Sequence, residues 1–233
     1  MSDFMIIGHR GAAGYEPENT LLSFRRAVDI GVDWIEFDLH RSADGHLVVI
    51  HDETVDRTTN GHGRVRDMTL GQLKGLDAGK GQQIPTLQEV IDLARGRVRM
   101  IPEIKQEGIE LELLDVIDRN GIVNDCMVAS FHGYSIRRCK EFNPTLQTAA
   151  IFSHLPIDFK AEALDVMADV LFLRKDIVSQ ALVEECHKNG FNVNIWNEDT
   201  PDEIRKYAAM GPDMMSSNYP DRLKQFVAAP SAA

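Results

Sequence analysis

Short apolar runs alternate with longer amphipathic runs along nearly the whole chain, and this alternation constrains the fold more than any other feature. Eight runs have the length and the β-branched content of strands, and eight longer runs have helical periodicity. The strand-like runs are 4–8, 34–41, 98–104, 126–130, 147–152, 170–173, 192–196 and 213–217. The helix-like runs are 20–30, 86–95, 109–120, 134–142, 158–168, 179–189, 201–210 and 221–227. Such alternation predicts a parallel sheet with helices outside it.

Eight strands and eight helices in 233 residues fit a closed (β/α)8 TIM barrel, a fold that typically needs about 250 residues. A doubly wound open sheet is the alternative α/β architecture. Capping boxes begin two of the helices, at Thr86 with Glu89 and at Thr200 with Glu203. We predict one barrel domain over residues 1–227 and a frayed C-terminal tail over 228–233.

The charge balance limits the classes of partner. The chain carries 25 Lys and Arg against 36 Asp and Glu, a formal net charge of −11, which argues against nucleic acid. No apolar run approaches the ~18 residues of a membrane span, and no signal peptide is visible. Three cysteines, an odd number without metal-type spacing, indicate free thiols. We expect a cytoplasmic protein without stable membrane association; the sequence predicts no oligomeric state.

One strand-like run, 47–50, interrupts the alternation. It follows the second strand after Asp44-Gly45, a dipeptide typical of tight hairpin turns. A two-residue loop would pair residue 43 with 46, and therefore Asp38 with His51. His51 would then lie on the face of the sheet that also carries Glu36, because successive side chains of a strand alternate between its two faces.

Residues 52–83 do not continue the alternation. We predict that they form a small insertion on the top face of the barrel, with a short helix capped at Thr69-x-x-Gln72. The insertion is polar and contains several basic side chains, namely Arg57, His62, Arg64 and Arg66.

Carboxylates gather at the predicted carboxyl ends of the strands, where the active sites of such barrels lie. Glu36 and Asp38 share one face of the second strand, and Glu103 ends a neighbouring one. Their oxygens would suit Mg²⁺ or Ca²⁺ better than zinc. The alternative is that the carboxylates form ion pairs with Arg10 and Lys105 inside the barrel.

Two histidines fall in the same region. His9 follows the first strand and His51 follows the hairpin. A lone histidine is more often structural, but two imidazoles near one reacting centre can divide the roles of base and acid in phosphoryl transfer. Arg10 and Lys105 would then hold phosphate oxygens.

Two aromatic residues also stand at strand ends. Trp196 is equally compatible with core filling and with an apolar wall of a pocket, whereas Phe131 fits the core unless the neighbouring strand ends form the site.

These residues belong to an ordered series of motifs: His9-Arg10-Gly11, Pro17-Glu18-Asn19-Thr20, Glu36-Phe37-Asp38, His51-Asp52, Arg57-Thr58-Thr59-Asn60-Gly61, Ile84-Pro85-Thr86-Leu87 and Glu103-Ile104-Lys105. The series resembles the glycerophosphodiester phosphodiesterases, of the phosphatidylinositol-phospholipase-C-like barrel group, over most of the chain. The chain departs from the usual pattern at Asn197, Asn218 and His132.

The resemblance implies hydrolysis of glycerophosphodiesters, such as glycerophosphocholine or glycerophosphoethanolamine, to sn-glycerol 3-phosphate and an alcohol. It implies one divalent cation, Mg²⁺ or Ca²⁺ with Mn²⁺ as a third candidate, held by Glu36, Asp38 and Glu103. It also implies that His9 and His51 act as an acid–base pair, through a cyclic phosphate.

Two other functions remain open on the sequence. A lysophospholipase D-type enzyme would need an apolar mouth, yet no hydrophobic loop stands out and the polar insertion favours small water-soluble diesters. A non-catalytic phosphate-binding barrel would not need two titrating histidines.

Overall fold

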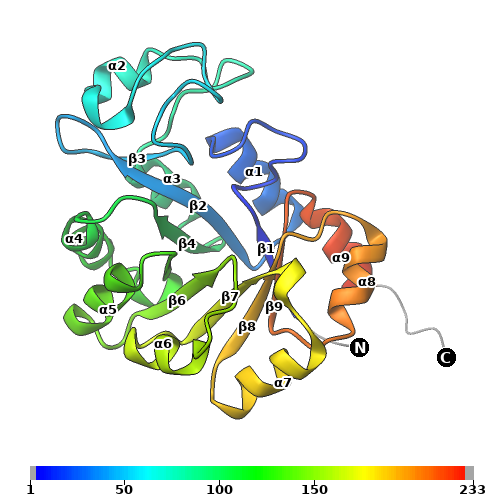
Figure 1. Cartoon of the computed structure of the whole chain (residues 1–233). Helices are drawn as coiled ribbons and strands as arrows, with labels where there is room; N and C mark the ends of the chain where they lie inside the picture. The colour runs from blue at the N-terminus through cyan, green and yellow to red at the C-terminus, as the bar shows by residue number, and fades with distance from the viewer. Residues whose placement is uncertain (1–3, 229–233) are drawn as a thin grey trace.

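The computed structural model describes residues 4–228, and its strands close into a barrel (Figure 1). The strands are β1 Met5–Gly8, β2 Trp34–Arg41, β3 Leu47–Val49, β4 Arg99–Ile104, β5 Met127–Ser130, β6 Gln147–Phe152, β7 Val170–Arg174, β8 Asn192–Trp196 and β9 Met214–Ser217. All but β3 pair in parallel, and β1 pairs with both β2 and β9. The predicted (β/α)8 TIM barrel is therefore confirmed, and the open sheet is excluded.

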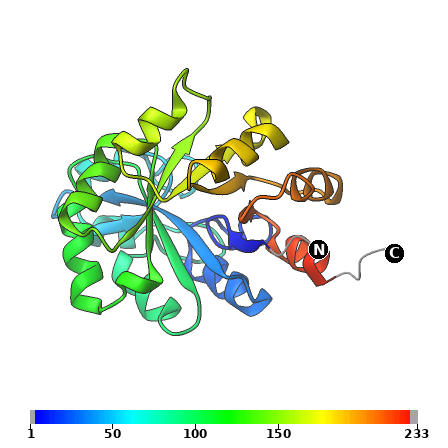
Figure 2. The ribbon, with the colours of Figure 1, turned by 90° about the horizontal axis from the view of Figure 1, so that it is seen from below.

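The helices form a ring outside the strands (Figure 2). They are α1 Leu21–Ile30, α2 Leu70–Lys74, α3 Leu87–Ala94, α4 Glu110–Asn120, α5 Gly133–Phe142, α6 Phe159–Asp165, α7 Gln180–Lys188, α8 Pro201–Ala208 and α9 Pro220–Ala228. Three short 3₁₀ turns join them, η1 Val65–Asp67, η2 Val123–Asp125 and η3 Lys175–Ile177. Capping boxes begin α2, α3 and α8 at the three threonines that the sequence indicates.

Strand β2 shows why the site lies inside the barrel. Phe37 faces outward and packs edge-on against Phe24 of α1, with the ring centres 5.8 Å apart. Trp34 faces inward and belongs to the small apolar cluster within the barrel. The period of two along a strand then places Glu36 and Asp38 on the inner side as well, toward the carboxyl end.

The register of the β2–β3 hairpin differs by one residue from the prediction. Leu39 pairs with Val49, so Asp38 lies opposite Ile50 and not opposite His51; the Ile50 amide donates to the Asp38 carbonyl at 3.0 Å. The loop has three residues because Gly45 adopts a left-handed conformation, with φ of +83°. His51 nevertheless reaches the inner side, because the chain leaves the sheet after Val49.

The segment between β3 and α3 carries η1 and α2 and stands beside the open end of the barrel (Figure 1). It has a small apolar core, made of Val48, Ile50, Val55, Val65, Leu73, Ala78 and Ile84. Because two strand-side residues belong to this core, we propose that the insertion 52–83 and the barrel form one domain.

All three cysteines are buried free thiols, as predicted. Burial raises the pKa of Cys126 and of Cys139 to about 12 and that of Cys186 to about 11. Among residues 4–228, no helix is both long and apolar enough to cross a bilayer. Residue 228 ends α9, and the rest of the predicted frayed tail lies outside the described residues.

Candidate active site

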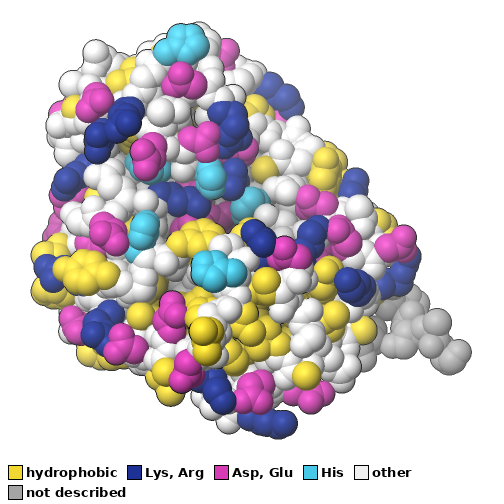
Figure 3. Space-filling view, in the orientation of Figure 1, with side chains coloured by type: hydrophobic (Ala, Val, Ile, Leu, Met, Phe, Trp, Pro, Cys, Tyr) yellow, Lys and Arg dark blue, Asp and Glu magenta, His cyan; other side chains and the backbone are white. Residues whose placement is uncertain are grey.

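Charged side chains and histidines gather around a hollow near the centre of the face shown in Figure 3. A cavity of about 120 Å³ lies at the carboxyl ends of the strands. It is lined by His9, Arg10, Glu36, His51, Glu103, Lys105, Phe131, Ile151, Phe172, Trp196 and Ser216. Eight of the nine residues that the sequence singles out line it, and the ninth, Asp38, forms ion pairs with two of them, Arg10 and Lys105.

Glu36, Asp38 and Glu103 form one buried cluster. Each offers a carboxylate oxygen within 4.8 Å of the other two, and each residue is at most 6% exposed. Asp38 and Glu103 lie side by side because β2 and β4 pair in parallel with these two residues in register. Adjacent strand ends therefore bring together carboxylates that are 65 residues apart in sequence.

Two cations offset part of this negative charge. Lys105 Nζ lies 2.5 Å from Glu103 and 3.2 Å from Asp38, and Arg10 Nε lies 3.3 Å from Asp38. The ion pairs that the sequence offered as an alternative to a metal therefore form. Among residues 4–228, no Lys or Arg side chain lies within 4.0 Å of the Glu36 carboxylate, and the His9 imidazole lies 3.9 Å from it.

The backbone of Arg10 serves the same cluster. Arg10 has a φ of +51°, and its amide donates to Glu36 Oε2 at 2.9 Å. Gly11 follows with a φ of +84°, and a Cβ there would collide with Ser23 of α1. The His-Arg-Gly motif is thus a tight turn that presents an amide, a guanidinium and an imidazole to one centre.

The pKa values reflect how closely negative charge is packed in this cluster. Burial and the carboxylates of Asp38 and Glu103 raise the pKa of Glu36 well above its usual range. Burial and Asp38 raise the pKa of Glu103 to about 7, whereas Lys105 and Arg10 outweigh burial and lower that of Asp38 to about 2. Glu36 Oε1 is buried and has no hydrogen-bond partner within the described residues. Three buried carboxylates with one unpartnered oxygen fit a hard divalent cation.

His9 is oriented by an amide. Asn218 Nδ2 donates to Asp199 Oδ2 at 2.7 Å, so Asn218 Oδ1 is an acceptor, and His9 Nδ1 donates to it at 2.8 Å. The neutral ring then carries its lone pair on Nε2, the nitrogen 3.9 Å from Glu36. Burial and the Arg10 charge lower the pKa of His9 to about 4. The Asn197 amide lies 3.3 Å from Nδ1 and 3.5 Å from Nε2, against the edge of the ring.

His51 has a charged partner instead. Its Nδ1 lies 2.6 Å from Asp52 Oδ1, and Arg57 holds that carboxylate from the insertion at 2.7 Å. Arg57 also pairs with Glu18, which pairs in turn with Arg10. A network of alternating charges therefore fixes the His51 loop against the His-Arg-Gly turn.

Phe131 and Trp196 form the wall of the cavity. Their rings meet edge-on with centres 6.1 Å apart, and Lys105 Nζ lies 5.4 Å from the Phe131 ring centre. Phe131 is 44% exposed, so it is not a core residue, whereas Trp196 both lines the cavity and packs against the apolar cluster inside the barrel.

An apolar lip, defined as Leu155 and Ile157 in the β6–α6 loop, borders the same end of the barrel. Ile157 is fully exposed and Leu155 is 41% exposed. The loop begins two residues after Ile151, which lines the cavity. The expectation that no hydrophobic loop stands out is therefore wrong. The apolar run Leu155-Pro156-Ile157 is short and contains a proline, so the sequence alone does not distinguish it from the start of a helix.

Three residues support the site in roles that the sequence did not assign. Asn19 donates to Asp38 Oδ2 at 2.7 Å, and Asp199 and Asn218 orient His9. Asn19 belongs to the motif Pro17-Glu18-Asn19-Thr20, but the motif by itself indicated no role for it. Asp199 and Asn218 come from different strand ends, and no local pattern connects them.

The comparison with protein families decides the identity of this arrangement. The model of the glycerophosphoryl diester phosphodiesterase family matches residues 9–222, from His9 to the last helix. The chain belongs to this family.

Relatives agree with this assignment over nearly full length. A glycerophosphodiester phosphodiesterase of Caldanaerobacter subterraneus subsp. tengcongensis is 36% identical, over 96% of this chain and 97% of that protein. A solved glycerophosphodiester phosphodiesterase from Agrobacterium tumefaciens is 28% identical with a TM-score of 0.84, over 94% of this chain and 98% of that one. An Oleispira antarctica phosphodiesterase, solved with the product sn-glycerol 3-phosphate, is 26% identical with a TM-score of 0.89, over 97% of both chains. The chain is accordingly an enzyme, and a glycerophosphodiester phosphodiesterase activity is supported.

Exchanging the acid and the amide behind His9 tests how the ring is oriented. In Asn218→Asp two carboxylates would face each other where the amide now donates, so we expect a loss of about 1–3 kcal/mol of stability. Adding Asp199→Asn restores one donor between the two side chains and should recover most of that loss. Thermal unfolding and the ¹⁵N shifts of the His9 ring measure both effects. Equal stability of the single and double variants would contradict this geometry.

Proposed function

We propose that this chain hydrolyses glycerophosphodiesters to sn-glycerol 3-phosphate and an alcohol, with His9 and His51 as its proton-transfer groups. The observation that carries the proposal is that two differently partnered histidines line one cavity with Glu36 and Glu103. Proteins that only bind phosphate need positive charge but no such pair. The product in the Oleispira antarctica complex is the one that this reaction would release.

We base the first roles of the two histidines on their hydrogen-bond partners. His9, whose Nδ1 faces the neutral amide of Asn218, presents a lone pair on Nε2 and takes the proton of the glycerol 2-hydroxyl. His51, whose Nδ1 lies beside the Asp52 carboxylate, gives a proton to the departing alcohol oxygen. The 2-oxygen bonds to phosphorus as the bond to that alcohol breaks, giving a cyclic phosphate. Water then opens the ring with the two roles reversed.

Basic and acidic side chains prepare the phosphate position. Arg10 and Lys105 lie on the cavity and bring positive charge to the phosphate oxygens. Glu36, Asp38 and Glu103 would hold a divalent cation, Mg²⁺, Ca²⁺ or Mn²⁺, which neutralises phosphate charge and lowers the pKa of the attacking hydroxyl when bound. Trp196 and Phe131 would shelter the carbon chain of the glycerol from water.

Replacing either histidine tests the central assignment. We expect His9→Ala and His51→Ala each to lower kcat for glycerophosphocholine and glycerophosphoethanolamine by about 10²–10⁴-fold, the usual contribution of one acid–base group. His46→Ala, in the exposed hairpin turn, is the matched control and should keep its rate. Release of sn-glycerol 3-phosphate is the assay, with thermal unfolding as the check on folding. Near wild-type rates in either variant would contradict the assignment of that histidine as a proton-transfer group.

Removing metal tests the carboxylate cluster. Chelation should abolish turnover, and adding back Mg²⁺, Ca²⁺ or Mn²⁺ should restore it, because the buried acids otherwise repel the phosphate. Glu36→Gln should weaken the binding of the added cation, which would raise the metal concentration needed for half of the maximal rate. Full activity in chelator would show that Arg10 and Lys105 suffice without a cation.

The apolar lip favours a second candidate, a lysophospholipase D-type activity. A 1-acyl lysophospholipid keeps the free 2-hydroxyl that the mechanism needs, and its acyl chain would leave the cavity beside Trp196 and pass over Leu155 and Ile157. Exposed apolar side chains at the mouth of a site are typical of enzymes that meet lipid.

The double variant Leu155→Ser/Ile157→Ser separates these substrates. We expect its kcat/KM for lysophosphatidylcholine to fall about tenfold, because two exposed apolar side chains that would partly cover the acyl chain are lost. The rate on glycerophosphocholine should not change. Rates are measured below the critical micelle concentration. No turnover of lysophosphatidylcholine by the wild type would exclude this second activity.

A further inference from the structure

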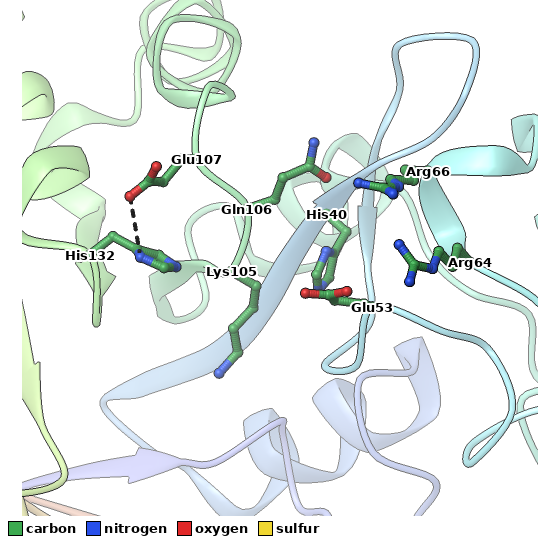
Figure 4. A pocket seen from close by; sticks show the side chains of 8 residues that line it. All are labelled: His40, Glu53, Arg64, Arg66, Lys105, Gln106, Glu107 and His132. Atoms are coloured by element: carbon green, nitrogen blue, oxygen red, sulfur yellow. Dashed lines mark ion pairs between the residues drawn. The ribbon is translucent and has the colours of Figure 1, made fainter.

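A second and larger cavity, of about 340 Å³, adjoins the catalytic one (Figure 4). It lies between the insertion, the end of β2 and the loops that follow β4 and β5. Its lining consists of His40, Glu53, Arg64, Arg66, Lys105, Gln106, Glu107 and His132. Lys105 lines both cavities, so a molecule bound at the carboxylate cluster can extend into this space without leaving the protein surface.

The position of this cavity matches one end of a diester. The apolar wall of the catalytic cavity, with Ile151, Phe172 and Trp196, comes from β6, β7 and β8. The second cavity lies between Lys105 and the insertion residues Arg64 and Arg66 (Figure 4). A phosphate held at Lys105 with its glycerol against the apolar wall would therefore direct the leaving alcohol into the second cavity.

The two arginines of the second cavity, Arg64 and Arg66, form few ion pairs with the protein. Arg64 forms no ion pair within the described residues, and the guanidinium of Arg66 pairs only at 4.0 Å with its neighbour Asp67. The acidic side is partly occupied, because the Glu107 carboxylate pairs with His132 at 3.3 Å. Figure 4 shows both arginines reaching from the insertion toward the cavity, near the Glu53 carboxylate.

We propose that this second cavity binds the leaving alcohol and selects alcohols that carry an anionic group, a carboxylate or a phosphate, through Arg64 and Arg66. The inference rests on the proposed hydrolysis of glycerophosphodiesters. Guanidinium groups pair with both kinds of anion as two-pronged donors. Glu53 is the opposing charge: it weakens binding of anions and sets the limit of the preference.

A matched series of substrates tests the selection. The series consists of glycerophosphodiesters of two-carbon alcohols that differ only in the terminal group: ammonium, hydroxyl, carboxylate or phosphate. For Arg64→Gln and Arg66→Gln we expect kcat/KM for the carboxylate and phosphate diesters to fall about threefold to tenfold relative to the hydroxyl diester. Comparing each variant with the wild type cancels differences in leaving-group reactivity.

Glu53→Gln provides a control of opposite sign. It should raise the same ratio, whereas Arg97→Gln, next to the start of β4 at the opposite end of the barrel, should leave the ratio unchanged. Added salt should reduce the wild-type preference for the anionic diesters, because it screens exposed charges. A loss with only one of the two anions identifies which anion the cavity prefers and supports the selection.

The outcomes separate this inference from the function on which it rests. If no diester in the series is hydrolysed, the proposed function fails. If the hydroxyl diester is hydrolysed but the arginine variants change all four substrates equally, or none of them, the anion selection is overturned and the activity stands. The selection would also be overturned if the ratio of kcat/KM between the anionic and hydroxyl diesters were the same in Glu53→Gln as in the wild type and did not change with added salt.

Discussion

The burial of three carboxylates at one end of the barrel is the constraint on which the rest of the site depends. Desolvation of several negative charges at one place is costly unless positive charge is brought to them. Arg10 and Lys105 supply two positive charges, and the Arg10 amide and Asn19 supply hydrogen bonds. Three carboxylates against two cations leave a position that a divalent cation fits, in a protein whose net charge of −11 by itself suggests no affinity for phosphate.

The two histidines are distinguished by what stands behind them. His9 has the amide of Asn218, and His51 has the carboxylate of Asp52. A neutral amide adds no charge beside the ring, whereas a carboxylate places a negative charge there. Identical side chains thereby have different surroundings, and each partner is in turn held by a charged residue, Asp199 in one case and Arg57 in the other.

The surface around the site consists of three parts that differ in chemistry. The apolar lip lies after β6, Arg10 and Lys105 line the central cavity, and the cavity with Arg64 and Arg66 lies toward the insertion. The barrel strands carry the carboxylate cluster, while the loops and the insertion carry the surfaces that, in the proposed function, would meet the two ends of a substrate. Such a division lets the ends of the substrate be selected without changing the carboxylate cluster.

The sequence by itself determined the barrel, because strand and helix periodicities are local, and it determined that Glu36 and Asp38 share a face. It failed on the hairpin register by one residue, because the conformation of Gly45 chooses between loop lengths that the same dipeptide permits. Only the tertiary structure joined Asp199 and Asn218 behind His9 and left Leu155 and Ile157 exposed in the loop after β6. Hydrogen bonds between loops and the exposure of a loop depend on how closed strands bring distant segments together, and no local pattern encodes that proximity.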